Sequence, residues 1–217
     1  MSQRRSFPPC HTVAVLLTVA VILALGVLLA WDIRLAARWA AEDNVIEWTQ
    51  VGLFAGAFAL GARGLTRLPV AGRGAAMDLL LTFFFGVLLI GELDLDYRLF
   101  GVHVVGTRFF TKPAVWLPYK ILAALIIGGV YLAVGAFAFR HRRDVWQETR
   151  RLTTECWGQL FLAGAAIFGF AQLFERQLNH WFLLPRNFFE ESLELIAAIY
   201  FLLAMIERSR STREPPG

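Results

Sequence analysis

Residues 12–31 read TVAVLLTVAVILALGVLLAW, a run without a charged side chain. A helix that crosses the hydrocarbon core of a bilayer needs about 20 mostly apolar residues. This stretch meets that requirement and predicts a membrane-spanning helix. It is longer than the apolar segment of a signal peptide, and no small-residue cleavage site follows it. We therefore expect it to remain in the protein as an anchor.

The rest of the chain has the same character. The 217 residues are 57% hydrophobic and 18% charged, whereas soluble domains are roughly 45–50% apolar and about 25% charged. Further apolar stretches of spanning length occupy residues 45–62, 76–91, 114–139, 157–174 and 188–206. The sequence predicts an all-α fold: a polytopic membrane bundle of six transmembrane helices, arranged as three helical hairpins in a single membrane domain over residues 1–217.

The basic residues predict the orientation of this bundle. Of the 21 Lys and Arg residues, 13 would lie on the side of both termini and seven on the other, with Lys120 inside the fourth span. Basic residues are retained on the cytoplasmic side of membrane proteins. We expect a multi-pass protein of the bacterial inner membrane with cytoplasmic N- and C-termini. The net charge of +4 follows from this bias and needs no nucleic-acid partner.

Cys10 and Cys156 would both lie on the cytoplasmic side. Disulfides are rare in that reducing compartment, so the sequence predicts two reduced thiols.

Carboxylates gather where the last predicted span begins. Glu190, Glu191 and Glu194 fall within two turns, and helix spacing places the first and third on one face. Carboxylates in hydrocarbon cost several kcal/mol, and they usually face a bundle interior or a pathway. Helix capping explains fewer acids than are present here. Glu191 and Glu194 therefore indicate a functional site near the periplasmic boundary.

Acidic residues from the other spans would lie at the same face. The third span runs into Glu92, Asp94 and Asp96, which line one side if the segment is extended, while a helix places only the first and third together. The fifth span ends at Glu175, with His180 nearby, and the first hairpin contributes Asp32 and Glu47 as secondary candidates. Lys120 is the expected counter-charge.

The first and last hairpins resemble each other at a constant offset of 143 residues, without a gap. The matched pairs are Gly26 with Gly169, Asp32 with Glu175, Asn44 with Asn187, and Glu47 with Glu190. Asn followed three residues later by Glu is also typical of an ordinary helix start. The pattern is open to two interpretations, an internal duplication and a pair of helix caps.

Residues 91–101, GELDLDYRLFG, resemble a GEExxWGQRxFG-type segment of uncharacterised bacterial polytopic inner-membrane proteins. The Glu190-Glu191-x-x-Glu194 opening and the stretch near His180 are similar to the same group. Leu93, Asp96 and Tyr97 depart from the pattern, and its Gln is missing. The resemblance implies a membrane location.

Three functions remain open on the sequence. The leading hypothesis is a protein that binds or moves a cation or a proton, because oxygen clusters suit hard cations and crowded carboxylates hold protons readily. The second is a membrane-embedded enzyme acting on lipid with a divalent cation. The third is a scaffold without catalysis, whose small-residue faces, such as the one with Gly52 and Gly56, bind another membrane protein. The motifs of hydrolases and nucleotide-binding proteins are absent from the sequence, so catalytic residues and any metal ligands are unknown.

Overall fold

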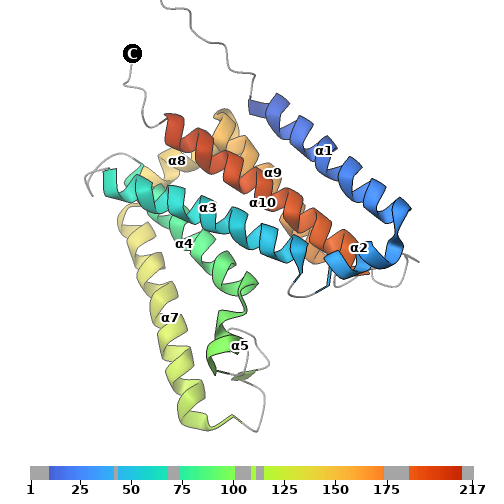
Figure 1. Cartoon of the computed structure of the whole chain (residues 1–217). Helices are drawn as coiled ribbons and strands as arrows, with labels where there is room; N and C mark the ends of the chain where they lie inside the picture. The colour runs from blue at the N-terminus through green and yellow to red at the C-terminus, as the bar shows by residue number, and fades with distance from the viewer. Residues whose placement is uncertain are drawn as a thin grey trace, which may run out of the picture. The chain divides into compact units, whose positions relative to one another are not determined.

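The computed structural model describes residues 10–41, 44–67, 74–100, 109–110, 115–173 and 186–211, and these residues contain helices and no strand (Figure 1). The helices follow one another as α1 (Cys10–Trp31), α2 (Ile33–Trp39), α3 (Val45–Arg67), α4 (Ala75–Glu92), α5 (Leu95–Phe100), α7 (Leu117–Arg140), α8 (Arg142–Thr154), α9 (Cys156–Leu173) and α10 (Arg186–Ser211). The all-α prediction is confirmed for this part of the chain.

Five of these helices are long and apolar enough to cross a membrane: α1, α3, α4, α7 and α9. Each coincides with a predicted span, and the ends differ by a few residues. The protein therefore has the helices of a multi-pass membrane protein. The helix α10 has the length for a sixth span, but Glu190, Glu191 and Glu194 lie near its start and Glu207, Arg208 and Arg210 near its end. The six-span, three-hairpin arrangement is not confirmed.

The chain divides into two compact units. Unit 1 comprises Met1–Leu60 and Thr149–Gly217, and unit 2 comprises Gly61–Glu148. The prediction of a single membrane domain is not tested by this division and stays a prediction.

Unit 1 is built around α9 and α10, which pack along one another, with α1 against both (Figure 1). Phe201 of α10 is fully buried and contacts rings from α3 and α9, including Phe54 at 6.4 Å and Phe161 at 5.3 Å between centroids. Gly164 of α9 admits this ring, because an added Cβ would lie 3.1 Å from it. Aromatic packing thus holds the three helices together at mid-length.

Two small clusters fix the directions of these helices. Ala14 of α1, Leu160 of α9 and Ala204 of α10 pack together, and Phe188 and Leu195 of α10 pack with Ala36 of α2, with Leu28 and Leu29 beside them. The start of α1, the start of α9 and the end of α10 therefore lie at one end of unit 1. The end of α1 and the start of α10 lie at the other.

The short helix α2 occupies a stretch that we expected to be a loop. Asp32 is its N-cap, and the Oδ1 atom accepts hydrogen bonds from the backbone N–H of Arg34 at 2.8 Å and of Leu35 at 3.1 Å. Ala36 and Ala40 bury its apolar side in the cluster with Phe188. The helix closes the end of unit 1 at which α10 begins.

Unit 2 contains α4, α5 and α7. Phe83 of α4 meets Tyr131 of α7 edge to face, with 6.1 Å between the ring centroids. No residue of α7 is buried, and its exposed side chains are largely apolar, as expected of a helix surrounded by lipid. Between α4 and α5, Asp94 has a φ of 45°, so residues 92–96 form neither one continuous helix nor an extended strand.

Candidate functional site

The candidate site lies where α9 ends and α3 and α10 begin, which we call the carboxylate end of unit 1. Gln50 is in the second turn of α3, one turn from Ile46 and one from Phe54, and all three are buried. Residues four apart share a helix face, so the side chain of Gln50 lies on the packed face of α3. Its exposed fraction is 0%.

Gln50 connects α3 to α10 through Glu191. The Nε2 atom of Gln50 donates to the backbone oxygen of Glu191 at 2.9 Å and to its carboxylate Oε2 at 3.1 Å. Glu191 lies three residues after Phe188 and four before Leu195, on a face that otherwise packs into the apolar cluster. The amide of Gln50 therefore supplies a polar partner to a carboxylate in apolar surroundings.

Glu194 is the most buried acid of this group, with an exposed fraction of 7%. The Nε2 atom of Gln172, in the last turn of α9, donates to Glu194 Oε1 at 2.7 Å. After Glu194, residues 195–206 of α10 carry no charge. Two glutamates of one helix are thus each met by a glutamine from a different neighbouring helix.

The other predicted acids near this end divide into two groups. Glu47, Glu190 and Glu194 all act electrostatically on the Glu191 carboxylate. Asp32 is exposed and caps α2, so its position is explained by capping. Asn44 directly precedes α3, whereas α10 begins before Asn187, so the prediction that both Asn residues precede their helices holds only for the first.

The remaining predicted residues do not belong to the described part of unit 1. Glu92 at the end of α4, Asp96 in α5 and Lys120 in α7 belong to unit 2. Glu175 and His180 lie outside the described residues. The prediction that these groups converge with Glu191 and Glu194 stays a prediction. Within the described ranges, no group of three His, Cys, Asp or Glu residues is arranged to hold a metal ion.

Sequence reasoning missed both glutamines. Each is a single polar residue in an apolar span, and nothing in its spacing identifies the carboxylate that it contacts. It also missed Asp78, a buried acid in the first turn of α4. A Cβ added to Gly64 of α3 would lie 3.1 Å from Asp78 Oδ2, so a glycine makes room for this carboxylate in unit 2.

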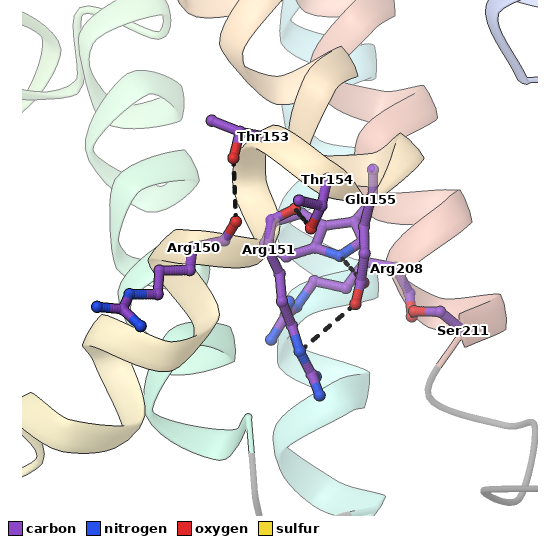
Figure 2. A network of polar contacts seen from close by, with 8 residues as sticks. Arg150, Arg151, Thr153, Thr154, Glu155, Arg208 and Ser211 are labelled. Carbon is purple, nitrogen blue, oxygen red and sulfur yellow. Dashed lines mark hydrogen bonds and ion pairs between the residues drawn. The ribbon is translucent and has the colours of Figure 1, made fainter.

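The opposite end of unit 1, which we call the arginine end, has a second polar network (Figure 2). The guanidinium carbon of Arg208 lies 4.3 Å from the ring centroid of Trp157, and Arg208 is 3% exposed. Trp157 Nε1 donates to Glu155 Oε2 at 2.6 Å, and Arg151 Nε lies 3.4 Å from Glu155 Oε1. This network joins the start of α9 to the end of α10 and to α8.

Cys156 also lies at the arginine end, at the first residue of α9, where it packs against the cluster of Ala14 and Leu160. It is disulfide-bonded. The prediction of a reduced thiol is therefore wrong for Cys156.

The small-residue face predicted on α3 is partly internal. A Cβ at Gly56 would meet Leu202 Cδ1 of α10 at 3.2 Å, whereas one at Gly52 would meet nothing within 4 Å. Gly56 thus serves packing within unit 1.

Comparison with known proteins finds no matching family model, no matching curated protein and no matching solved structure.

Proposed function

We propose that this integral membrane protein binds a small cation or a proton at the carboxylate end of unit 1 and lets it enter or cross the membrane there. The observation that carries the proposal is the buried Glu194, held by Gln172 beside the Glu191–Gln50 pair. Burying an ionised carboxylate costs several kcal/mol unless a positive charge or a proton compensates it. A bound cation or proton offsets that cost.

The amide partners support a binding role over simple capping. Caps satisfy the free N–H groups in the first turn of a helix, but Glu191 and Glu194 accept hydrogen bonds from side chains of other helices. A carboxylate at a helix end that binds no ligand is more stable when water hydrates it than when other helices enclose it. The contacts of these two acids are those of groups positioned inside a bundle.

We further propose that α10 crosses the membrane as a sixth span. It packs along α9 and against α1, both of which are candidate spans. Its end lies beside the starts of α1 and α9, in the cluster with Ala14 and Leu160. Such packing supports a path for α10 through the same slab of membrane as its neighbours. The lipid-enzyme and scaffold hypotheses stay predictions.

Uptake by proteoliposomes tests the proposed function. The wild-type protein, reconstituted with an internal pH dye or with external radioactive sodium, is expected to take up protons or sodium. Glu194→Gln should lower the uptake rate by about ten-fold or more, because it removes the buried charge that holds the ion. Asp144→Asn is the matched control, since Asp144 is an exposed acid of α8. Equal uptake of both ions by empty and protein-containing vesicles would contradict the proposal.

The orientation is tested separately. The excess of basic residues supports a cytoplasmic arginine end and a periplasmic carboxylate end, whereas the disulfide at Cys156 is typical of an oxidising compartment. We propose the first orientation, because the basic residues are distributed along the whole chain. A membrane-impermeant maleimide should label Arg34→Cys in intact spheroplasts and leave Thr154→Cys unlabelled. The reverse pattern would invert the orientation.

A further inference from the structure

The helix α7 leads from the apolar part of unit 2 to a strongly basic corner. Residues 121–139 of this helix carry no charge, and Lys120 and Arg140 lie at the two ends of this stretch. At 1.5 Å per residue, these two residues are about 30 Å apart along the helix, which equals the thickness of the hydrocarbon core. Trp116 and Tyr119, both exposed, lie at the first end, as interfacial aromatic residues do. Arg140 therefore marks the other membrane surface.

The helix α8 begins two residues after Arg140, and its start is basic. Arg142 and Arg143 are both exposed, and Trp146, with an exposed fraction of 59%, lies four and three residues after them. Residues at these spacings share one helix face. Asp144, the acid of the first turn, is two residues from Trp146 and lies on a different face. We call Arg140, Arg142, Arg143 and Trp146 the basic corner.

The end of α7 holds one of these arginines at the level of the membrane surface. The guanidinium carbon of Arg142 lies 5.0 Å from the ring centroid of Phe139. Phe139 is the last apolar residue of α7 and is 70% exposed. A guanidinium group over a ring keeps N–H donors at its edge, and these match the oxygens of a phosphate. Arg142 is thus placed between the hydrocarbon and the headgroups, where lipid phosphates lie.

The position of the arginines in α8 also favours an anion. The start of a helix carries a partial positive charge, which stabilises acidic side chains and destabilises basic ones. Arg142 and Arg143 are the first two residues of α8, so their charges add to that of the helix. The helix alone gives no reason for two cations at its start. A bound anion would offset both unfavourable contributions.

We propose that the basic corner binds the headgroup of an anionic phospholipid, with Arg142 and Arg143 at the phosphate and Trp146 beside the upper acyl chain. Anionic lipids attract basic groups that follow a membrane span or lie on an amphipathic helix. Zwitterionic lipids have no net charge and lack this attraction. The inference is independent of the ion site proposed at the carboxylate end, because the basic corner belongs to unit 2.

The test is a titration of the purified full-length protein in neutral detergent with phosphatidylglycerol, read by native mass spectrometry. Phosphatidylcholine with the same acyl chains is the reference lipid. The wild-type protein should bind phosphatidylglycerol about ten-fold more tightly or better. Arg142→Gln/Arg143→Gln should weaken phosphatidylglycerol binding by about thirty-fold, because each basic group near an anionic lipid contributes about five-fold. Binding of phosphatidylcholine should not change.

The matched control removes two arginines that already have acidic partners. Arg151 Nε lies 3.4 Å from Glu155 Oε1, and Arg210 Nη1 lies 2.6 Å from Glu207 Oε1. Arg151→Gln/Arg210→Gln lowers the net charge by the same amount and should weaken phosphatidylglycerol binding by less than about three-fold. Equal losses in the two double variants would assign the lipid preference to the net charge of the protein and overturn the inference.

Two measurements on the wild-type protein keep the inference falsifiable if Arg142→Gln/Arg143→Gln misfolds. Choline chloride at about 0.5 M should weaken phosphatidylglycerol binding by about ten-fold, because salt screens the attraction between exposed charges. Inorganic phosphate at the concentration of the lipid should not compete, because it has no acyl chains to lie beside Trp146. Equal affinity for the two lipids, binding that does not respond to salt, or competition by inorganic phosphate would overturn the inference.

Discussion

The two ends of unit 1 bury opposite charges in different ways. At the arginine end, Arg208 lies against the face of Trp157, and Glu155 joins that ring to Arg151. At the carboxylate end, Glu191 and Glu194 accept hydrogen bonds from neutral amides, and one amide oxygen is left without a donor. The first arrangement pairs a cation with an aromatic face and an ion pair, and the second leaves a buried amide oxygen of Gln50 without a hydrogen bond among the described residues.

Buried charged groups thus have different surroundings at the two ends of the same helices. A buried cation that is stacked and linked to an ion pair contributes to stability. A buried pair of like charges lowers stability and is retained where function requires it. We therefore expect substitutions at the arginine end to affect folding and substitutions at the carboxylate end to affect ion binding.

The largest effect on stability is expected at Gly158, at the start of α9. A Cβ at this position would overlap the backbone of Leu152 in α8. Because a backbone cannot move aside like a flexible side chain, Gly158→Ala should cost about 3 kcal/mol or more. Thermal unfolding in detergent measures this. Gly169→Ala in the same helix is the control, since a Cβ there meets nothing within 4 Å. A similar loss of stability in both variants would mean that the loss at Gly158 does not come from close packing against Leu152.

Removing the cation at the arginine end should have the next largest effect. Arg208→Met keeps an extended side chain but loses the contact between the guanidinium and Trp157, which is worth about 2 kcal/mol when it is desolvated. Arg210→Met, at an exposed ion pair with Glu207, should change stability by less than about 0.5 kcal/mol. The difference between the unfolding free energies of Arg208→Met and Arg210→Met tests this expectation. Equal values would remove the stabilising role assigned to Arg208.

A smaller change is expected when only the indole N–H is removed. Trp157→Phe keeps an aromatic face for Arg208 but loses the hydrogen bond to Glu155. We expect a cost of about 1 kcal/mol in thermal unfolding. Trp146→Phe is the control, because Trp146 is 59% exposed on α8. If Trp157→Phe lowers stability as much as Arg208→Met does, then the hydrogen bond from the indole to Glu155 provides most of the stability of this network.

The smallest effect on stability is expected at the carboxylate end. Glu194→Gln removes a buried charge but retains an oxygen that can accept from Gln172, so unfolding in sodium-free buffer should change by less than about 1 kcal/mol or shift towards stability. The same variant should lose its response to cations. A large loss of stability without a change in that response would assign Glu194 a structural role.

The sequence predicted the helices better than the site. Apolar runs such as 12–31 and 157–174 determine α1 and α9, because bilayer thickness sets one length for every span. The predicted span at 188–206 stays a prediction, because α10 carries charges near both ends. Glu191 and Glu194 stand out because three acids exceed what a helix cap needs, but their partners Gln50 and Gln172 lie 141 and 22 residues away in the chain. Contacts between helices depend on rotation and depth, which a single sequence does not specify.

The start of α9 illustrates the same limit. Gly158 and Trp157 read as ordinary residues of an apolar span, yet one permits the close approach of Leu152 and the other contacts Arg208. Asp32 was predicted as a secondary site residue, whereas it caps a short helix that the sequence did not predict. The residue types were thus readable from the sequence, while the neighbours that give them a role were not.

The most direct measurement is the sodium-induced rise in the thermal midpoint, recorded side by side for the wild-type protein, Glu194→Gln and Arg208→Met. We predict that Glu194→Gln abolishes the rise and leaves the midpoint in sodium-free buffer nearly unchanged. Arg208→Met should lower that midpoint and keep the full rise. A full rise in Glu194→Gln would contradict the assignment of cation binding to the carboxylate end.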